Sequence, residues 1–372
     1  MRTNKAVGIV FGNIHDDDVP QLTASRCLAS VPFGGRYRLI DFCLSNMASS
    51  GITKVGIIAK RNYQSLLAHL GSGKSWDLSR KNAGIILLPP YAEAKAIYNT
   101  RFEAIAGVST FIKRCTEDYI VMSDCDNVCN FDYDSAIRYH IEKNADITAI
   151  YRRRTFDASS SRPHNLMTMD DTGRVTKVEL GDKNTAGERC FFTNMLVISR
   201  RFLLTILGDG KNYTSFSKDV MKKTNEYRIF GYELTGYYSC IDSLSSYLRH
   251  NLDLLQKENR DLLFKKESGA MILTKVRDSA PLRLENGSKV TNSFVADGCI
   301  IEGEVRNSVL FRGVRVAKGA VITNSVVMQG VSVSIGSSIN SCVVDKNVII
   351  LDKRNLSGHA THPYFIAKNS VI

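Results

Sequence analysis

The chain has 372 residues, of which 44% are hydrophobic and 23% charged, and its formal net charge is +12. This length predicts two domains, and the ordinary composition excludes a disordered chain. The positive charge favours an anionic partner, but the basic residues are dispersed and no nucleic-acid-binding motif accompanies them, so a solvated basic surface is favoured over a nucleic-acid groove.

The first 150 residues alternate short apolar runs with segments of helical spacing. Strands alternating with helices in this way predict an α/β domain with a mostly parallel sheet and right-handed crossovers. The predicted strands are 6–11, 55–59, 85–88, 119–123 and 145–151, and the predicted helices are 44–51, one around 66–70, 99–114, and 134–143 with Ile137 and Ile141 facing inward.

The strand predicted at 119–123 ends in acidic residues, Asp124 and Asp126. They are expected at the carboxyl edge of the sheet, where open α/β folds place ligands and where Mg²⁺ with a phosphate is commonly held. Capping of the next helix or a solvated loop is the alternative. The two aspartates therefore mark the candidate site.

The loop after the first strand would carry glycines in a nucleotide-binding protein. Here residues 12–18 read Gly-Asn-Ile-His-Asp-Asp-Asp. Three successive carboxylates repel a triphosphate unless a cation intervenes. A solvated turn is favoured over a triple-aspartate metal site.

The remainder of the chain changes pattern after residue 256. Before it, strands are predicted at 175–180 and 191–198 and helices at 202–207 and 243–255. Residues 257–279 form a charged connector. Asn-Ser then recurs at 292, 307, 324 and 340, and in the first three copies a glycine follows six residues after the Asn. This period, rich in Val and Ile, predicts a parallel β-helix over 280–372.

Cysteine usage and the apolar runs indicate the compartment. The nine cysteines include no Cys-x-x-Cys pair, which favours a reducing environment; Cys125 and Cys129 are expected to be buried thiols. No run is long enough for a membrane span, and no cleavage-site pattern follows the first strand. A soluble, cytoplasmic protein with no membrane partner is expected.

Residues 32–42 read Pro-Phe-Gly-Gly-Arg-Tyr-Arg-Leu-Ile-Asp-Phe, followed by Leu-Ser-Asn at 44–46 and Ser-Gly-Ile at 50–52. This segment resembles the P-F-G-G-K/R-Y/F-R-I-I-D-F-x-L-S-N-x-x-x-S-G-I motif of the ADP-glucose pyrophosphorylases, or glucose-1-phosphate adenylyltransferases, which supply the glucosyl donor for glycogen and starch. More narrowly, the chain is similar to their GlgD-type companion subunits. The resemblance implies a Rossmann-like nucleotidyltransferase domain with a mostly parallel mixed sheet over 1–256 and a left-handed parallel β-helix over 280–372.

The resemblance also implies that much of the nucleotide site is degenerate. Catalytic members have a G-G-x-G-x-R-L loop, a phosphate-binding lysine, a nucleotide-contacting glutamine and a G-T-A-D-A element. With the sequences aligned on Leu22, the loop glycines correspond to Asn13, Ile14 and Asp16, after Gly12, and the loop arginine corresponds to Asp18. The phosphate-binding lysine corresponds to Leu28 and the glutamine to Lys60. The G-T-A-D-A element corresponds to residues 100–104, which include Glu103.

The metal site that the resemblance implies is also incomplete. The family holds Mg²⁺ between two aspartates: Asp126 matches the first, but the second falls on Cys240, and a thiol is a poor ligand for Mg²⁺. Asp242 lies two residues on and could replace it from an extended backbone; otherwise it is expected to cap the following helix. The family's sugar-phosphate E-K-P motif has no clean counterpart, and Lys183 is taken as a surface residue.

These losses predict a regulatory, largely non-catalytic subunit, because one charge-stabilising group is typically worth roughly 3 to 4 kcal/mol. No intact catalytic residues, metal or cofactor are expected in this chain alone; Mg²⁺ would serve a catalytic GlgC-type partner, in a heterotetramer, with self-association as the alternative. The expected effector is a phosphorylated sugar or a nucleotide, and the candidate effector residues are Arg26, Arg38 and Arg114.

Three alternatives stay open. The chain could be an active adenylyltransferase that uses Asp126 and Asp242, or it could bind ADP-glucose or glucose 1-phosphate without turnover. A β-helix sugar acyltransferase is disfavoured because His359 and His362 lie beyond the recognisable coils.

Overall fold

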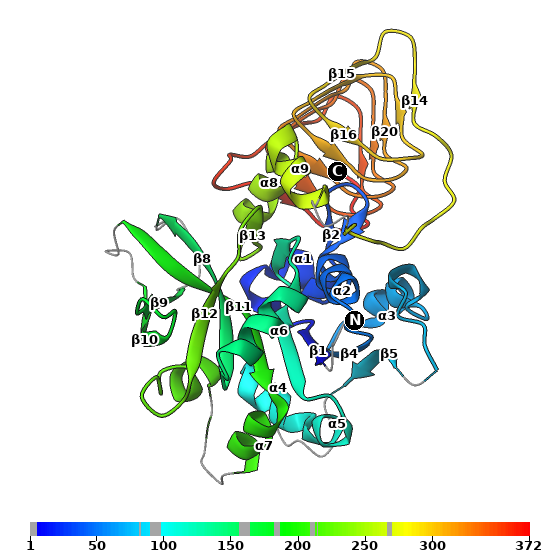
Figure 1. Ribbon diagram of the computed structural model, residues 1–372. Coiled ribbons are helices and arrows are strands. Elements are labelled where there is room, and N and C mark those ends of the chain that lie inside the picture. The colour runs from blue at the N-terminus through cyan, green and yellow to red at the C-terminus, as the bar shows by residue number, and fades with distance from the viewer. Residues whose placement is uncertain are drawn as a thin grey trace.

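The computed structural model describes residues 6–81, 83–89, 98–155, 164–181, 187–208, 213, 215–265 and 270–372. The chain forms an α/β domain and a triangular β-helix that stands on one end of it (Figure 1). Both parts of the predicted architecture are confirmed. None of the described helices is long and apolar enough to cross a membrane.

A mixed nine-stranded sheet forms the centre of the α/β domain. Its strand order is β10-β9-β11-β6-β1-β4-β5, with β8 paired to both β11 and β12. The half built from β6, β1, β4 and β5 is parallel, whereas β11 runs antiparallel to β6 and β8. The strands are β1 (Ala6–Phe11), β4 (Lys54–Ile58), β5 (Gly84–Leu88), β6 (Tyr119–Asp124), β8 (Ile147–Thr155), β9 (Asn165–Met169), β10 (Val175–Leu180), β11 (Glu188–Ser199) and β12 (Ile229–Glu233).

The central strands are buried on both faces, as their apolar runs predict. Val7 and Ile9 of β1 pack into the core on one side of the sheet, while Ala6 and Val10 pack into the core on the other. Helices cover these faces: α1 (Pro20–Thr23), α2 (Leu39–Ser49), α3 (Gln64–Leu70), α4 (Arg101–Gly107), α5 (Ser109–Arg114), α6 (Tyr133–Glu142), α7 (Arg200–Gly208), α8 (Leu244–Asp253) and α9 (Lys257–Phe264).

Short elements complete the domain. They are the two-stranded pairs β2 (Pro32–Phe33) with β3 (Tyr37–Arg38) and β7 (Asn127–Cys129) with β13 (Tyr238–Cys240), the 3₁₀ turns η1 (Asp16–Asp18), η2 (Leu28–Ser30) and η3 (Lys74–Trp76), and the π-helical turn η4 (Phe216–Val220).

Two helix predictions need correction. The helix expected over 99–114 is two helices, because Val108 leaves helical geometry with φ −109° and ψ 18°. In α6, Ile137 is buried as expected, but Ile141 is 48% exposed, because the apolar side of this helix is narrower than its periodicity indicates.

The β-helix consists of three parallel sheets of five short strands. They contain β14 (Arg283–Leu284), β17 (Ile300–Ile301), β20 (Arg315–Val316), β23 (Ser332–Val333) and β26 (Ile349–Ile350); β15 (Lys289–Thr291), β18 (Glu304–Arg306), β21 (Val321–Thr323), β24 (Ser338–Asn340) and β27 (Asn355–Ser357); and β16 (Phe294–Val295), β19 (Val309–Leu310), β22 (Val326–Val327), β25 (Cys342–Val344) and β28 (Tyr364–Ile366).

The Asn repeat marks one corner of this β-helix. Asn292, Asn307 and Asn324 have φ of 42°, 45° and 48°, the left-handed region that Asn tolerates better than most residues. Their side-chain amides are stacked, with Asn292 donating to Asn307 over 2.8 Å. In the fourth copy the left-handed residue at the corner is Ser341, with φ 50°, and not Asn340. The Asn-Ser pair at 340 is therefore shifted by one residue relative to the corner.

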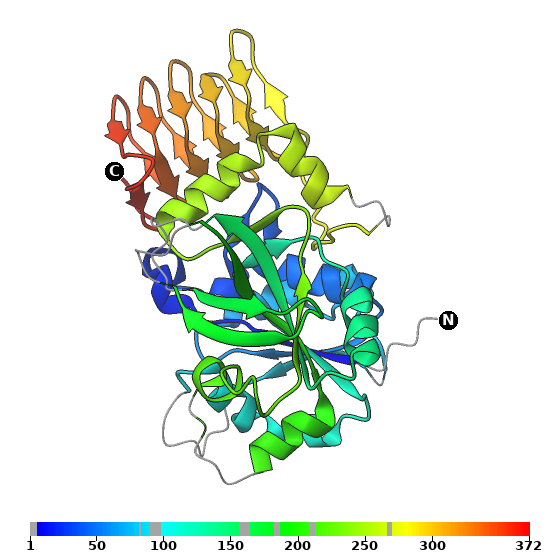
Figure 2. The same cartoon turned by 60° about the vertical axis from the view of Figure 1, so that its left-hand side comes forward.

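The two domains share a buried junction. Arg26 forms a bidentate ion pair with Asp345 at 2.8 and 2.9 Å, and both side chains are almost completely buried. The Tyr247 hydroxyl of α8 donates to the Pro32 carbonyl over 2.6 Å. Helices α8 and α9 lie between the sheet domain and the β-helix (Figure 2), so the segment expected as a plain connector from 257 begins with a helix.

Candidate functional site

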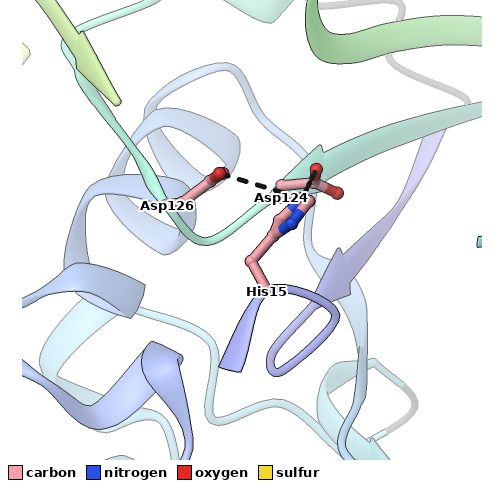
Figure 3. Close-up of side chains that lie close together, drawn as sticks. All are labelled: His15, Asp124 and Asp126. Carbon is pink, nitrogen blue, oxygen red and sulfur yellow. Dashed lines mark hydrogen bonds and ion pairs between the residues drawn. The ribbon is translucent and has the colours of Figure 1, made fainter. Parts of the chain in front are cut away.

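The candidate site lies at the carboxyl edge of β6, where the sequence places it. Asp124 ends β6 opposite Phe11, the last residue of β1, and the loop after β1 brings His15 to the same edge (Figure 3). Asp124 and Asp126 are 0% and 1% exposed. Two carboxylates so deeply buried need cationic or hydrogen-bonding partners.

Arg101 and His15 supply these partners. The Arg101 Nε lies 2.9 and 3.1 Å from the two oxygens of Asp124, and Nη2 also bonds Oδ2. The His15 Nε2 lies 2.9 Å from Asp124 Oδ2, 3.8 Å from Asp126 Oδ2 and 2.8 Å from the Arg101 Nη2. Nε2 donates to the carboxylate when it carries a hydrogen, in the imidazolium or in the Nε2–H tautomer, and accepts from the guanidinium when the ring is the Nδ1–H tautomer.

The electrostatics follow from these contacts. Burial alone raises the pKa of Asp124, but Arg101 and His15 bring it well below its usual value. Burial lowers the pKa of His15, whereas Asp126, Asp124 and Asp18 raise it more, so that the net pKa of His15 is raised. The site is therefore an internal ion cluster in which the Asp124 carboxylate is anionic.

Cys240 lies against Asp126, as the alignment implies. Strand β13 pairs with β7 so that Cys240 is opposite Asn127, and its Sγ lies 3.4 Å from Asp126 Oδ2. The thiol thus stands beside the retained aspartate, and it is a poor ligand for a hard cation.

Asp242 does not cap α8, which is one of its two expected roles. Its backbone N–H donates to the Ser246 hydroxyl, and its Oδ1 accepts from the Ser243 hydroxyl. The N-cap of α8 is Ser243, whose side chain accepts from the Ser246 N–H, so the expectation that Asp242 caps this helix is wrong. Asp242 is not in the one group of three or more potential metal ligands found in the described part of the chain.

The loop before η1 folds inward, which corrects the expectation of a solvated turn. Asp16 is 2% exposed, and its Oδ1 accepts from the Leu28 N–H over 2.8 Å. Burial raises the pKa of Asp16 to about 7. Asp18 pairs with the His15 Nδ1 at 3.0 Å, and only Asp17 is fully exposed, where it pairs with Arg61.

The other residues of the degenerate nucleotide site make structural contacts. The buried Asn13 accepts from the Tyr98 hydroxyl over 3.0 Å, and the Lys60 Nζ donates to the Tyr98 carbonyl over 3.0 Å. The Gly12 carbonyl accepts from the Ala29 N–H. Glu103 is exposed and forms the capping box of α4 with Thr100, so its visible role is helix capping. The buried Leu28 fills core volume.

Two of the three candidate effector arginines, Arg26 and Arg38, lie close enough at the domain junction for their charges to interact. Arg26 is committed to Asp345, whereas Arg114 lines an apolar surface pocket beside β5 and α5. Arg38 lines a cavity at the domain junction, which we call the junction cavity. Its cationic lining residues are Arg36, Arg38, Lys275, Arg277, Arg312 and Lys346.

The fit of the site to Mg²⁺ is poor. His15, Asp124 and Asp126 offer ligand atoms within 4.8 Å of one another, but the Arg101 guanidinium bonds both oxygens of Asp124. A metal would compete with that guanidinium for the same carboxylate. As arranged, the side chains suit ion pairing rather than metal-assisted phosphoryl chemistry.

Two further expectations concern other parts of the chain. His359 and His362 are exposed and share hydrogen bonds with Thr361. They lie between β27 and β28, in the last coil of the β-helix, so the expectation that they lie beyond the coils is wrong. This exposed loop offers no enclosed acyl-transfer site. Lys183 lies outside the described residues.

His15 and Arg101 are the site residues that the sequence argument missed. Both appear in segments it considered, but neither is assigned a role there. A usable signal is that Arg101 replaces a neutral residue of the family's G-T-A-D-A element, while an aspartate, Asp124, stands next to the retained Asp126 segment at the end of β6.

Comparisons with known proteins agree with this architecture. Residues 20–180 match the family model described as nucleotidyl transferase, and residues 281–361 match the GlmU-like C-terminal hexapeptide model. The chain is 34% identical over 378 residues to "Glycogen biosynthesis protein GlgD" of Bacillus subtilis (strain 168), covering 100% of this chain and 98% of that protein.

Two relatives from Geobacillus stearothermophilus extend the comparison. One, "Glycogen biosynthesis protein GlgD", is 33% identical and covers 86% of this chain and 83% of its own length. The other, "Glucose-1-phosphate adenylyltransferase", is 31% identical with the same coverage. The chain therefore belongs to the glucose-1-phosphate adenylyltransferase family of glycogen biosynthesis, with a nucleotidyltransferase domain followed by a left-handed β-helix.

Proposed function

We propose that this chain is a regulatory, largely non-catalytic subunit of glucose-1-phosphate adenylyltransferase, acting in the cytoplasm on a catalytic GlgC-type partner. The partner would form ADP-glucose and pyrophosphate from ATP and glucose 1-phosphate, with Mg²⁺ as its cofactor. The observation that carries this proposal is the ion cluster at β6, because the carboxylate of Asp124 is bonded to Arg101 rather than open to a metal and nucleotide.

The surrounding loop supports the absence of catalysis. Adenylyl transfer depends on positioning phosphates and neutralising their charge. Here Asp16 and Asp18 occupy the glycine and arginine positions of the phosphate loop, and the buried Leu28 occupies the lysine position. A triphosphate would meet carboxylates and an apolar side chain where the family provides amides and cations.

The junction cavity supports effector binding. Six Lys or Arg side chains line it, no carboxylate is among its lining residues, and it lies between the two domains. Such a concentration of positive charge favours a phosphorylated ligand. The cavity volume of about 40 Å³ suits a single phosphate group. The phosphate of a sugar phosphate or nucleotide would enter it and contact both domains, while the rest of the ligand would lie outside on the surface.

The last coil of the β-helix supports assembly with another subunit. Strands β26, β27 and β28 each end their sheet, and this coil exposes apolar side chains, namely Ile349, Leu351, Tyr364 and Val371. Residues 370–372 cover the edge of β26 by bonding Ile349 and Leu351, and the exposed apolar side chains of this coil favour association. A heterotetramer with the catalytic subunit is the assembly we propose. All nine cysteines carry thiols, which suits a reducing compartment.

The test of this function is ADP-glucose formation from ATP and glucose 1-phosphate with Mg²⁺, measured for this chain alone, the catalytic partner alone, and the mixture. We expect no turnover by this chain alone and a higher rate or a lower effector requirement in the mixture. Turnover by this chain alone that is abolished by Asp126→Asn and Asp242→Asn would contradict the proposal and support the active-enzyme alternative.

A further inference from the structure

The buried carboxylates at the end of β6 already have a cation of their own. We propose that Arg101, assisted by His15, is a resident counter-ion that occupies both oxygens of Asp124 and thereby keeps divalent cations out. This inference concerns occupancy of the site and holds whether or not the chain regulates a partner.

The contacts of Asp124 carry the first step. Arg101 Nε lies 2.9 Å from Oδ1 and 3.1 Å from Oδ2, its Nη2 bonds Oδ2, and His15 Nε2 lies 2.9 Å from Oδ2. Both oxygens of this fully buried carboxylate are therefore engaged. A planar guanidinium matches a carboxylate with parallel bonds, whereas a divalent cation needs the same lone pairs.

The placement of Arg101 is fixed by its helix. Arg101 is the first residue of α4, between the N-cap Thr100 and Glu103, and these two residues bond each other's backbone in a capping box. The next residue, Phe102, packs edge-on against Tyr213 with ring centroids 5.4 Å apart. Because the start of α4 is anchored on both sides, the guanidinium is held at the carboxylate rather than ranging over the surface.

His15 is held in the same way from the other side. Its Nδ1 pairs with Asp18 at 3.0 Å, and its Nε2 faces both aspartates, at 2.9 Å from Asp124 and 3.8 Å from Asp126. The aspartate that stands at the family's arginine position thus orients the imidazole. The loop after β1 has become part of the counter-ion system.

Removing Arg101 should uncover a latent metal site. The ligand atoms of His15, Asp124 and Asp126 lie within 4.8 Å of one another, and imidazole with carboxylates is a ligand set that suits divalent transition ions. Mn²⁺ is a suitable probe because the free ion is counted directly by electron paramagnetic resonance.

The experiment titrates Mn²⁺ into the full chain and its variants. Wild type should leave added Mn²⁺ free, whereas Arg101→Ala should bind about one ion per chain with at least tenfold higher affinity than wild type. Arg101→Ala combined with Asp124→Asn should lose that binding. Arg80→Ala is the matched control, because Arg80 pairs with the exposed Asp77 outside this cluster and should behave as wild type.

Thermal unfolding gives a second readout. Arg101→Ala leaves buried carboxylates without their guanidinium and should lower the melting temperature by about 5 °C or more, and Mn²⁺ should restore part of this loss because it binds only the folded chain. Arg101→Met, which keeps side-chain length, serves if the alanine variant does not fold. Stoichiometric Mn²⁺ binding by wild type that Asp124→Asn removes would overturn the proposal, as would folded Arg101 variants that bind no Mn²⁺.

Discussion

At the scale of single residues, Arg26 belongs to the family's phosphate-binding segment but holds two domains together in this chain. Its guanidinium reaches Asp345 in the β-helix, and both partners are buried. A buried ion pair adds little to the folding stability compared with an apolar pair of similar size. Removing one partner, however, leaves a buried charge without its counter-ion and is strongly destabilising. The pair therefore fixes the registry of the two domains.

A double-mutant cycle tests this role of Arg26. Arg26→Ala should destabilise the chain by about 3 to 5 kcal/mol, because Asp345 stays buried without its cation. Arg26→Ala with Asp345→Ala should cost less than the sum of the two single changes. Chemical denaturation followed by circular dichroism measures the three values, and strict additivity would contradict the assigned coupling.

At the scale of secondary-structure elements, the β-helix depends on close backbone approach between coils. A Cβ on Gly303 would lie 2.3 Å from the Ala320 carbonyl oxygen and 2.7 Å from that of Ala317. Backbone atoms of the next coil cannot yield as a flexible side chain can. This position is therefore restricted to glycine by the stacking itself.

Gly303→Ala should consequently lower the free energy of unfolding by more than about 1 kcal/mol. Gly107→Ala, at the end of α4 where no atom lies within 4 Å of the added methyl group, is the matched control and should be neutral or slightly stabilising. Equal stability of the two variants, measured by denaturant unfolding, would contradict the close-packing account.

The elements themselves were largely predictable because each carries a local pattern. The apolar runs at β1, β4, β5 and β6 and the period of the β-helix specify buried strands without any knowledge of neighbours. The inward fold of residues 12–18 was not predictable in this way. Asp16 is buried by a long-range bond from Leu28, and nothing in the run of three aspartates indicates which one turns inward.

The candidate site was predictable in position but not in content. Asp124 and Asp126 follow from the end of a buried strand, and Cys240 follows from the family alignment. Arg101 is 23 positions from Asp124 in the sequence, and His15 is 109 positions from it. Neither contact therefore has a signature in the local sequence. Asp242 failed as a cap because Ser243, one residue later, already has the hydroxyl that caps α8.

At the scale of the whole molecule, the proposed effector site in the junction cavity contains a lysine that titrates near neutral pH. Lys346 lies in it, and burial, with the neighbouring Arg38 and Arg26, lowers the pKa of Lys346 to about 7. Lys346 therefore gains its charge as the pH falls through about 7. A bound phosphate would favour that charged form.

Binding of a phosphorylated ligand should thus tighten between pH 8 and pH 6, provided the ligand's charge is held constant with a sulfate analogue. Isothermal titration of wild type and Lys346→Met measures this, and the variant should show weaker binding and a flatter pH dependence. Lys318→Met, in an exposed turn of the β-helix outside the cavity lining, is the control. If Lys346→Met bound the ligand with the same pH dependence as the wild type, Lys346 would not be the titrating group of the site.

The most direct test of the regulatory role uses a fixed amount of the catalytic partner. ADP-glucose formation is measured as this chain is added, either as wild type or with Asp126→Asn and Asp242→Asn together. The regulatory account predicts that both forms stimulate the partner to the same extent, because the stimulation needs contact and not this chain's carboxylates. Stimulation by wild type that is lost in the folded double variant would contradict it and show that the added activity comes from this chain.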